Sequence, residues 1–187
     1  MKKLTLILGA VVLGFVLSSC TKNPSETILK QVNDFFTQAE AKINAIDNAA
    51  DLVNFVHSFA DEKEQFGQKL DETFGKDENG IYKGMTAEGM EQLMNSISER
   101  ATEYNKIEYA KCGEIMQPYI EKFDGIVKAL VAQREAGEEF QDETVDQLKS
   151  AYEDITNYAD IVPEELANIF YADDEIVTQL FPKTEEE

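Results

Sequence analysis

The amino-acid sequence predicts an all-α protein, an antiparallel bundle of five or six amphipathic helices that follows a cleaved signal peptide. Between residues 26 and 182, apolar side chains recur at intervals of three and four residues, the spacing that forms one face of an α-helix. No stretch alternates apolar and polar residues as a half-buried strand does. The links between helical stretches are short, which favours antiparallel neighbours. We therefore expect one helical domain at 26–182 and a solvated acidic tail at 183–187.

The first nineteen residues have the pattern of a secretory signal. Lys2 and Lys3 precede a largely apolar run at 4–17 that contains no charge and no proline. A membrane-spanning helix needs about twenty apolar residues, whereas a signal needs a basic start and about 7–15 apolar residues. The run therefore fits a cleaved signal peptide at 1–19.

The signal ends in Leu17-Ser18-Ser19-Cys20, which resembles the lipobox of bacterial lipoproteins. The resemblance covers about the first twenty residues. It implies that the chain is cut before Cys20, that the Cys20 sulfur receives a diacylglyceryl group, and that the new amino group is usually acylated. Residues 20–25 would then be the lipidated cysteine and a short tether. Two or more acyl chains hold a protein firmly, because each buried methylene contributes about 0.8 kcal/mol.

The residues after Cys20 bear on location, again through the resemblance. The family's usual signal for retention in the inner membrane is an aspartate directly after the cysteine, and this chain has Thr21. The segment 21–26 also lacks the acid-rich tract that some bacteria use for surface export. The resemblance therefore implies an outer-membrane location, facing the periplasm, in a bacterium with two membranes.

Two apolar stripes open the helical domain. Pro24 and Ser25 look like a helix start, and the link at 47–51 between the stripes is short and not strongly helix-breaking. Residues 26–74 are therefore predicted to be either one long bent helix or two helices in a tight hairpin. The first stripe contains Ile28, Leu29, Val32, Phe35, Phe36, Ala39, Ile43 and Ile46, and the second contains Leu52, Val53, Val56, Phe59, Phe66, Leu70 and Phe74.

Residues 75–85 form the clearest loop, with three glycines and an Asn-Gly turn signal. Residues 77–80, Asp-Glu-Asn-Gly, are similar to the middle of a calcium-binding EF-hand loop. With Gly80 at the sixth position of such a loop, however, Gly75 and Thr86 would occupy the two end positions, which require carboxylates. We therefore expect a polar turn and no metal site.

The second half of the domain is predicted to contain the remaining helices. Thr86 is a candidate cap for a helix that ends near 112–113, because Pro118 is expected to forbid an uninterrupted helix. A further helix then runs to about Glu135, and another spans about 142–160. Pro163 is expected to open the last helix. The stripes are Met90, Leu93, Met94, Ile97, Ala101 and Tyr104; Tyr119, Ile120, Phe123, Ile126, Val127, Leu130 and Val131; Val145, Leu148, Tyr152, Ile155 and Tyr158; and Leu166, Ile169 and Phe170, followed by Ile176, Val177, Leu180 and Phe181.

Charge excludes one class of partner. Without the two signal lysines the mature chain carries 15 basic and 37 acidic side chains, a formal charge of −22. Such a surface repels nucleic acid phosphates and anionic lipid headgroups. We therefore expect no nucleic acid partner, and contact with the membrane only through the lipid on Cys20.

Few residues are suited to catalysis. His57 is the only histidine; with Asp61 one helical turn later it could hold a metal or form a hydrogen bond, but we expect a residue at the border of the core. A lipidated Cys20 leaves Cys112 unpaired, and Cys112 is expected to be a small buried hydrophobe instead of a reactive thiol or an intermolecular link. There is no nucleophile elbow, haem-attachment motif or glycine-rich phosphate loop. We expect no enzymatic activity, no cofactor and no metal site.

The sequence therefore favours a protein-interaction or structural module, anchored in the bacterial cell envelope, whose partner is another envelope protein. The alternative is a lipoprotein that binds a small apolar ligand in a cavity between helices, since the eleven Phe, seven Tyr and five Met residues could line one. A contiguous exposed apolar patch would favour the module, and a closed internal pocket would favour the ligand carrier.

Overall fold

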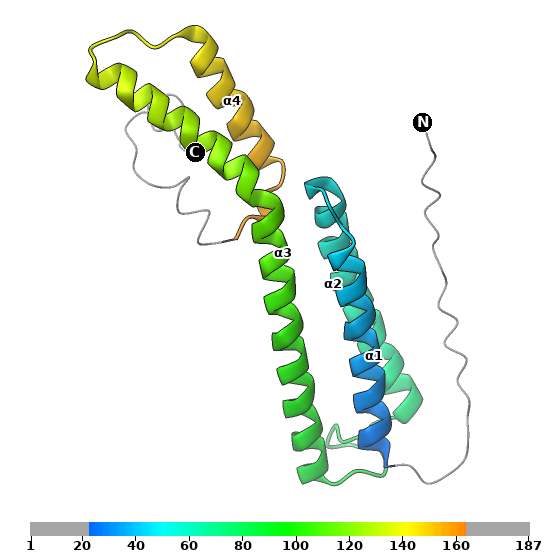
Figure 1. Ribbon diagram of the computed structural model, residues 1–187. Helices are drawn as coiled ribbons and strands as arrows, with labels where there is room; N and C mark the ends of the chain where they lie inside the picture. The colour runs from blue at the N-terminus through cyan, green and yellow to red at the C-terminus, as the bar shows by residue number, and fades with distance from the viewer. Residues whose placement is uncertain (1–22, 164–187) are drawn as a thin grey trace, which may run out of the picture.

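The computed structural model describes residues 23–163, and the prediction of an all-α fold is confirmed over this range. Apart from one isolated bridge between Lys76 and Tyr82, these residues form no β-structure. The predicted signal peptide, Cys20, the last helix after Pro163 and the acidic tail lie outside the described residues. The described elements are α1 (Pro24–Asn44), α2 (Ala49–Phe74), α3 (Ala87–Glu135), α4 (Asp142–Thr156) and the 3₁₀ turn η1 (Ala159–Ile161) (Figure 1).

Residues 26–74 form two helices, so the hairpin is the correct one of the two predicted alternatives. The Asn23 side chain accepts a hydrogen bond of 3.1 Å from the Ser25 backbone N–H at the start of α1. Asn48 caps α2 in the same way, accepting from the Asp51 N–H at 2.9 Å. These caps satisfy N–H groups that the first helical turn leaves without partners. Figure 1 shows α2 running back beside α1.

The prediction that α3 is interrupted before Pro118 is wrong, because α3 is one helix of 49 residues with Pro118 inside it. A proline inside a helix costs about 3 kcal/mol, since it removes one hydrogen bond and crowds the preceding turn. Ile115, Met116 and Ile120 are buried around this proline. Each contributes about 1.5–3 kcal/mol by leaving water, so their packing outweighs the local cost. Figure 1 shows α3 bent along its length, as expected of a helix that contains proline.

The ends of α3 and α4 agree with the helix ends predicted from the sequence, with one difference. Thr86 caps α3, accepting from the Gly89 N–H at 3.1 Å, and Gly137 follows α3 with a φ of 70°, a conformation that glycine adopts without strain. The helix predicted at about 142–160 is shorter at its end, because α4 ends at Thr156. The chain continues after a short turn as η1, which packs against α2.

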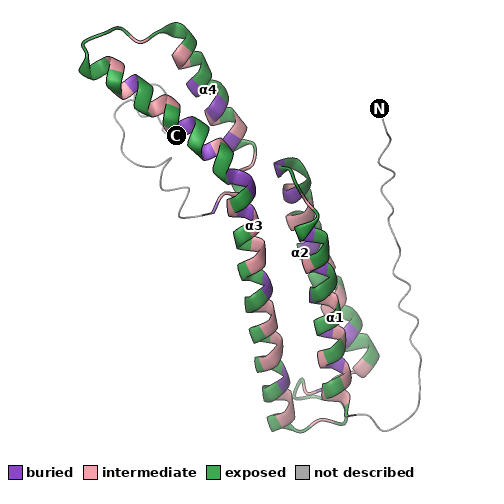
Figure 2. Ribbon diagram, viewed as in Figure 1, coloured by how far each residue is buried: buried purple, intermediate pink, exposed green. Residues whose placement is uncertain are grey.

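The buried side chains form two cores that follow one another along α3 (Figure 2). The first core lies among α1, α2, the loop at 75–86 and the first half of α3. The second lies among the end of α1, the start of α2, the second half of α3, α4 and η1. Because α3 contributes to both, it determines the length of the molecule. The first core contains Ile28, Val32, Phe36, Ala39, Phe59, Leu70, Tyr82, Leu93 and Tyr104. The second contains Ile43, Ala49, Leu52, Cys112, Ile115, Met116, Ile120, Phe123, Leu130, Leu148, Ala151, Ile155 and Ile161.

Candidate functional site

The predicted lipidation site is close in sequence to one end of the molecule. Cys20 lies outside the described residues, but α1 begins at Pro24, four residues later. At Pro24 the chain meets the loop at 75–86, where a Cβ on Gly84 would lie 3.5 Å from the Pro24 Cγ. One end of the elongated molecule, or rod, is therefore formed by the start of α1, this loop and the start of α3 (Figure 1). We call it the anchor end.

The loop at 75–86 is folded around its own side chains. The Asp77 carboxylate accepts hydrogen bonds of 2.9 Å from the N–H groups of Asn79 and Ile81, and Gly80 adopts a φ of 77°. Asp77 thus closes a turn with one of its oxygens. Within the described residues no group of three or more His, Cys, Asp or Glu side chains is placed to hold a metal ion.

Three polar side chains link this loop to the end of α2. The buried Tyr82 donates its hydroxyl to Asp71 at 2.7 Å, and the Lys76 ammonium lies 2.8 Å from the same carboxylate. The Lys76 hydrogen bond, followed by that of Tyr82, lowers the pKa of Asp71. Burial, followed by the Asp71 hydrogen bond, raises the pKa of Tyr82. Sequence reasoning missed this group, because a tyrosine inside a predicted loop has no periodicity that indicates burial.

Tyr104 is the contrasting case in the first core. It is fully buried, and its hydroxyl has no hydrogen-bond partner among the described residues. Burial, followed by the nearby Glu108 carboxylate, raises the pKa of this phenol. The two buried tyrosines therefore differ: Tyr82 makes a hydrogen bond of good geometry to Asp71, whereas among residues 23–163 no group makes one to the Tyr104 hydroxyl.

We expect phenylalanine to have opposite effects at these two tyrosines. Tyr82→Phe should lower the free energy of unfolding by about 1–2 kcal/mol, because it removes one of the two donors to the Asp71 carboxylate and leaves only Lys76. Tyr104→Phe should leave stability unchanged or raise it by up to about 1 kcal/mol, because it removes a buried hydroxyl without a partner. Urea unfolding of both variants measures this difference. Equal losses would show that the Tyr104 hydroxyl has a partner, such as a buried water.

Cys112 is buried, as predicted, with 8% of its surface exposed. Burial, followed by the charge of Glu108, raises the pKa of its thiol to about 11. A thiol that stays protonated near neutral pH is a poor nucleophile. The structure thus places Cys112 in the core and not beside His57, which contacts a different element.

The raised pKa of Cys112 predicts a loss of stability in alkaline solution. The thiol of the unfolded chain ionises near pH 9 and that of the folded chain near pH 11, so the stabilising contribution is complete below pH 9 and is lost between pH 9 and pH 11. We expect a loss of about 2 kcal/mol from this group in a chain that carries Cys20→Ala. Urea unfolding at pH 8 and at pH 10.5 measures it. Cys112→Ala should show a smaller decrease over the same range, and an equal decrease would contradict the assignment.

His57 connects two elements that are distant in the sequence. Its Nε2 lies 3.0 Å from an Asp160 carboxylate oxygen in η1, and both side chains are exposed. The sequence leaves Asp61 as one possible partner and favours a residue at the border of the core, whereas in the structure His57 is exposed and its carboxylate partner comes from η1. An exposed pair of this kind contributes little to stability. The His57–Asp160 pair therefore belongs to the contact between α2 and η1.

An ion pair joins α1 to α3 in the first core. Arg100 lies 2.6 Å from Glu40, and its guanidinium lies 5.5 Å from the centre of the Phe36 ring. The Arg100 side chain is 14% exposed and that of Glu40 is 23% exposed. The hydrophobic pattern does not predict this pair, because neither residue belongs to an apolar stripe.

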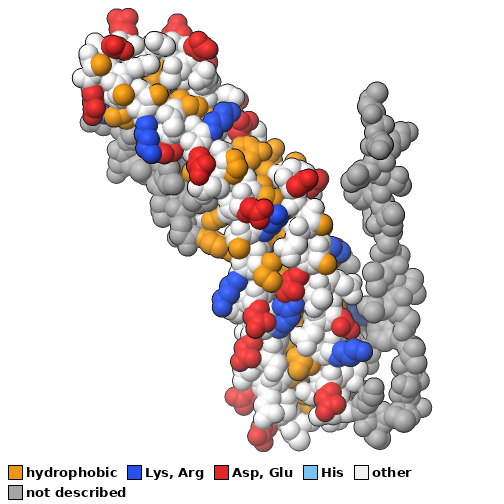
Figure 3. All heavy atoms as spheres, in the orientation of Figure 1, with side chains coloured by type: hydrophobic (Ala, Val, Ile, Leu, Met, Phe, Trp, Pro, Cys, Tyr) orange, Lys and Arg blue, Asp and Glu red, His pale blue; other side chains and the backbone are white. Residues whose placement is uncertain are grey.

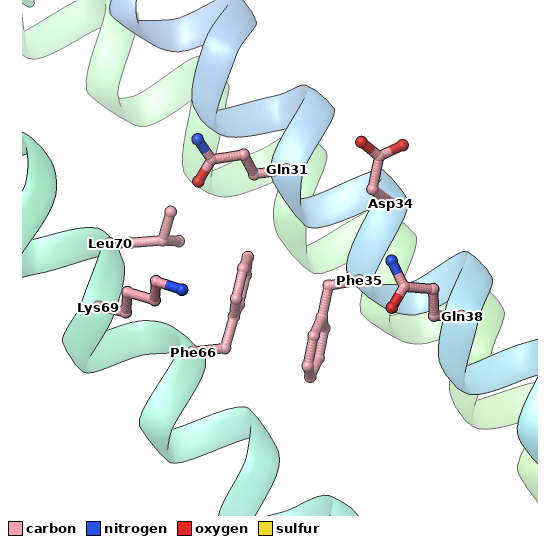
Figure 4. A pocket seen from close by; sticks show the side chains of 7 residues that line it. All are labelled: Gln31, Asp34, Phe35, Gln38, Phe66, Lys69 and Leu70. Atoms are coloured by element: carbon pink, nitrogen blue, oxygen red, sulfur yellow. The ribbon is translucent and has the colours of Figure 1, made fainter. Parts of the chain in front are cut away.

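The described part of the surface includes two hollows beside helix ends and rings. One, of about 70 Å³, lies between α1 and α2 beside the Phe35 and Phe66 rings, whose centres are 4.4 Å apart (Figure 4). Its lining also includes Gln31, Asp34, Gln38, Lys69 and Leu70 (Figure 4). The other, of about 300 Å³, lies where the turn between α1 and α2 meets α3 near Pro118. Its lining includes Asp47, Asn48, Ala49, Lys111, Glu114, Ile115 and Tyr119.

Comparison with protein-family models, with curated proteins and with solved structures finds no match to this chain. Within residues 23–163, no helix has an apolar stretch long enough to cross a bilayer.

Proposed function

We propose that this chain is a lipid-anchored, acidic helical lipoprotein of the bacterial cell envelope that acts as a protein-interaction or structural module. The observation that carries the proposal is the length of α3, whose 49 residues belong to two successive cores. At 1.5 Å per residue this helix is about 73 Å long. A rod of this length has a large surface for its volume, which suits contact with another protein better than enclosure of a small molecule.

The anchor in this proposal is the lipid on Cys20, and the location is the outer membrane, facing the periplasm, in a bacterium with two membranes. The lipobox-like residues 17–20 and the short distance from Cys20 to Pro24 support it. We propose in addition that residues after Pro163 add a helix to the four described, which completes an antiparallel bundle of five helices over 26–182.

The sizes of the two hollows favour the module over the ligand carrier. Sites for small molecules usually occupy about 300–1,000 Å³ and are mostly apolar. The apolar hollow beside Phe35 measures about 70 Å³. The hollow near Pro118 measures about 300 Å³, but its lining includes Asp47, Lys111 and Glu114. Neither combines the size and the apolar lining that a small apolar ligand requires.

Photocrosslinking in intact cells tests the proposed role. Met94 and Tyr109 are large apolar residues of α3 that are 49% and 45% exposed, so a photoreactive amino acid at either position samples the surface without disturbing a core. We expect a discrete crosslinked product with an envelope protein. The same variants with Cys20→Ala, which lack the anchor, should lose it. Absence of any product, together with a co-purifying apolar molecule detected by native mass spectrometry, would favour the ligand carrier.

A further inference from the structure

We propose that the rod stands on the bilayer with its anchor end toward the lipid headgroups, so that the opposite tip, residues 133–146, is the part farthest from the membrane. This inference rests on the proposed lipid anchor at Cys20. Beyond the anchor itself, the orientation specifies which surface of the domain faces the lipid and which surface is presented to a partner.

The first argument is the reach of the tether. Cys20 and Pro24 are four residues apart, so even a fully extended chain places the start of α1 within about 14 Å of the lipidated sulfur. Gly84 of the loop at 75–86 lies close to Pro24, since a Cβ on Gly84 would be 3.5 Å from the Pro24 Cγ, and α3 begins directly after this loop. A tether of this length therefore keeps the whole anchor end next to the headgroups.

The second argument is the direction of α3. It begins at Ala87 at the anchor end, and it ends at Glu135 at the opposite end, where a short loop leads into α4 (Figure 1). The rise of its 49 residues places the two ends up to about 73 Å apart, less the shortening caused by the bend. The tip at 133–146 therefore lies far from Pro24, which the tether keeps close to the headgroups.

The third argument is the distribution of charge, which distinguishes a standing rod from a rod that lies flat. The loop at 75–86 contains two lysines and two acidic residues, and the first turns of α1 (24–27) and α3 (87–91) add Glu26, Glu88 and Glu91, so the anchor end carries a formal charge of −3. The tip contains Arg134 and six acidic residues. Figure 3 shows several acidic side chains gathered at this tip. A rod lying flat would bring those carboxylates within a Debye length, about 8 Å, of anionic headgroups, whereas a standing rod keeps them outside it.

Energy transfer from three single labels to the bilayer tests this orientation. The full lipidated chain, purified from membranes, is placed on vesicles of phosphatidylcholine with phosphatidylglycerol that contain an acceptor lipid. A donor dye is attached at Asn79→Cys in the anchor-end loop, at Asn105→Cys within α3, or at Gln141→Cys beside the tip. All three positions are exposed, and Gln141 caps α4 without a side-chain hydrogen bond. The parent chain, with Cys112 buried, gives the labelling background.

We expect transfer to decrease from position 79 to position 105 to position 141, with a several-fold difference between the first and the last. Equal transfer at the three positions would show a rod lying flat, and the reverse order would show a rod anchored by its other end; either result overturns the orientation. Flotation of the vesicles, measured first, separates this result from a failure of the anchor. If the chain purified from membranes carries no lipid on residue 20, or carries it and does not float, the proposed anchor itself is overturned.

Discussion

Phe59→Ala is expected to lower the free energy of unfolding by about 3–5 kcal/mol, a large part of the 5–15 kcal/mol that stabilises a typical domain. The Phe59 ring is 1% exposed and lies at the centre of the first core. The loss combines the transfer free energy of the ring with the cavity that remains, because the surrounding rings are held by three helices. The distances from the centre of the Phe59 ring to those of its neighbours are 5.4 Å for Phe35, 6.4 Å for Phe36, 5.6 Å for Phe55 and 4.7 Å for Tyr104.

Urea unfolding followed by circular dichroism measures this loss. Tyr109→Ala is the matched control, since it also removes an aromatic ring but at a position of α3 that is 45% exposed. We expect the control to change stability by no more than about 0.5 kcal/mol. A loss below 1 kcal/mol for Phe59→Ala would mean that the cluster of rings is not a packed core.

Cys20→Ala is expected to have the largest effect on location, moving the protein from the membrane fraction to the soluble fraction of the envelope or blocking its processing. Acyl chains provide the attraction in this account, at about 0.8 kcal/mol per buried methylene. The rest of the mature chain, at −22, is repelled by anionic headgroups.

Fractionation and metabolic palmitate labelling measure this effect in cells. Cys112→Ala is the matched control, because it also removes a cysteine and should leave both the label and the membrane fraction unchanged. Palmitate labelling that persists in Cys20→Ala would contradict lipidation at this residue.

The positions of most described helices could be predicted because they depend on local signals. The sequence indicates Thr86 as a cap, Pro24 as part of a helix start and the glycines of 75–86 as a loop, and each acts within a few residues of its own position. The cap at Asn48 was missed. The apolar stripes likewise indicated which face of each helix is buried, although Met94, which belongs to a predicted stripe, is 49% exposed. Phe36, Phe59 and Leu130 were all placed on the predicted stripes and are buried in the structure.

The errors arose where packing between distant segments overrides a local rule. Pro118 was expected to end a helix, but burial of its neighbours in the second core keeps α3 continuous. His57 was considered with Asp61, whereas its bound carboxylate belongs to Asp160 in η1. Tyr82 in the loop at 75–86 and the Arg100–Glu40 pair were not anticipated, since their partners become neighbours only after the chain folds.

The central claim, a helical rod held to a membrane by the lipid on Cys20, is tested most directly by the intact mass of the protein extracted from bacterial membranes. We predict the mass of residues 20–187 plus a diacylglyceryl group, with or without an added N-terminal acyl chain, and fragmentation that locates the lipid on residue 20. A mass equal to that of the unmodified chain, cleaved or uncleaved, would contradict the account.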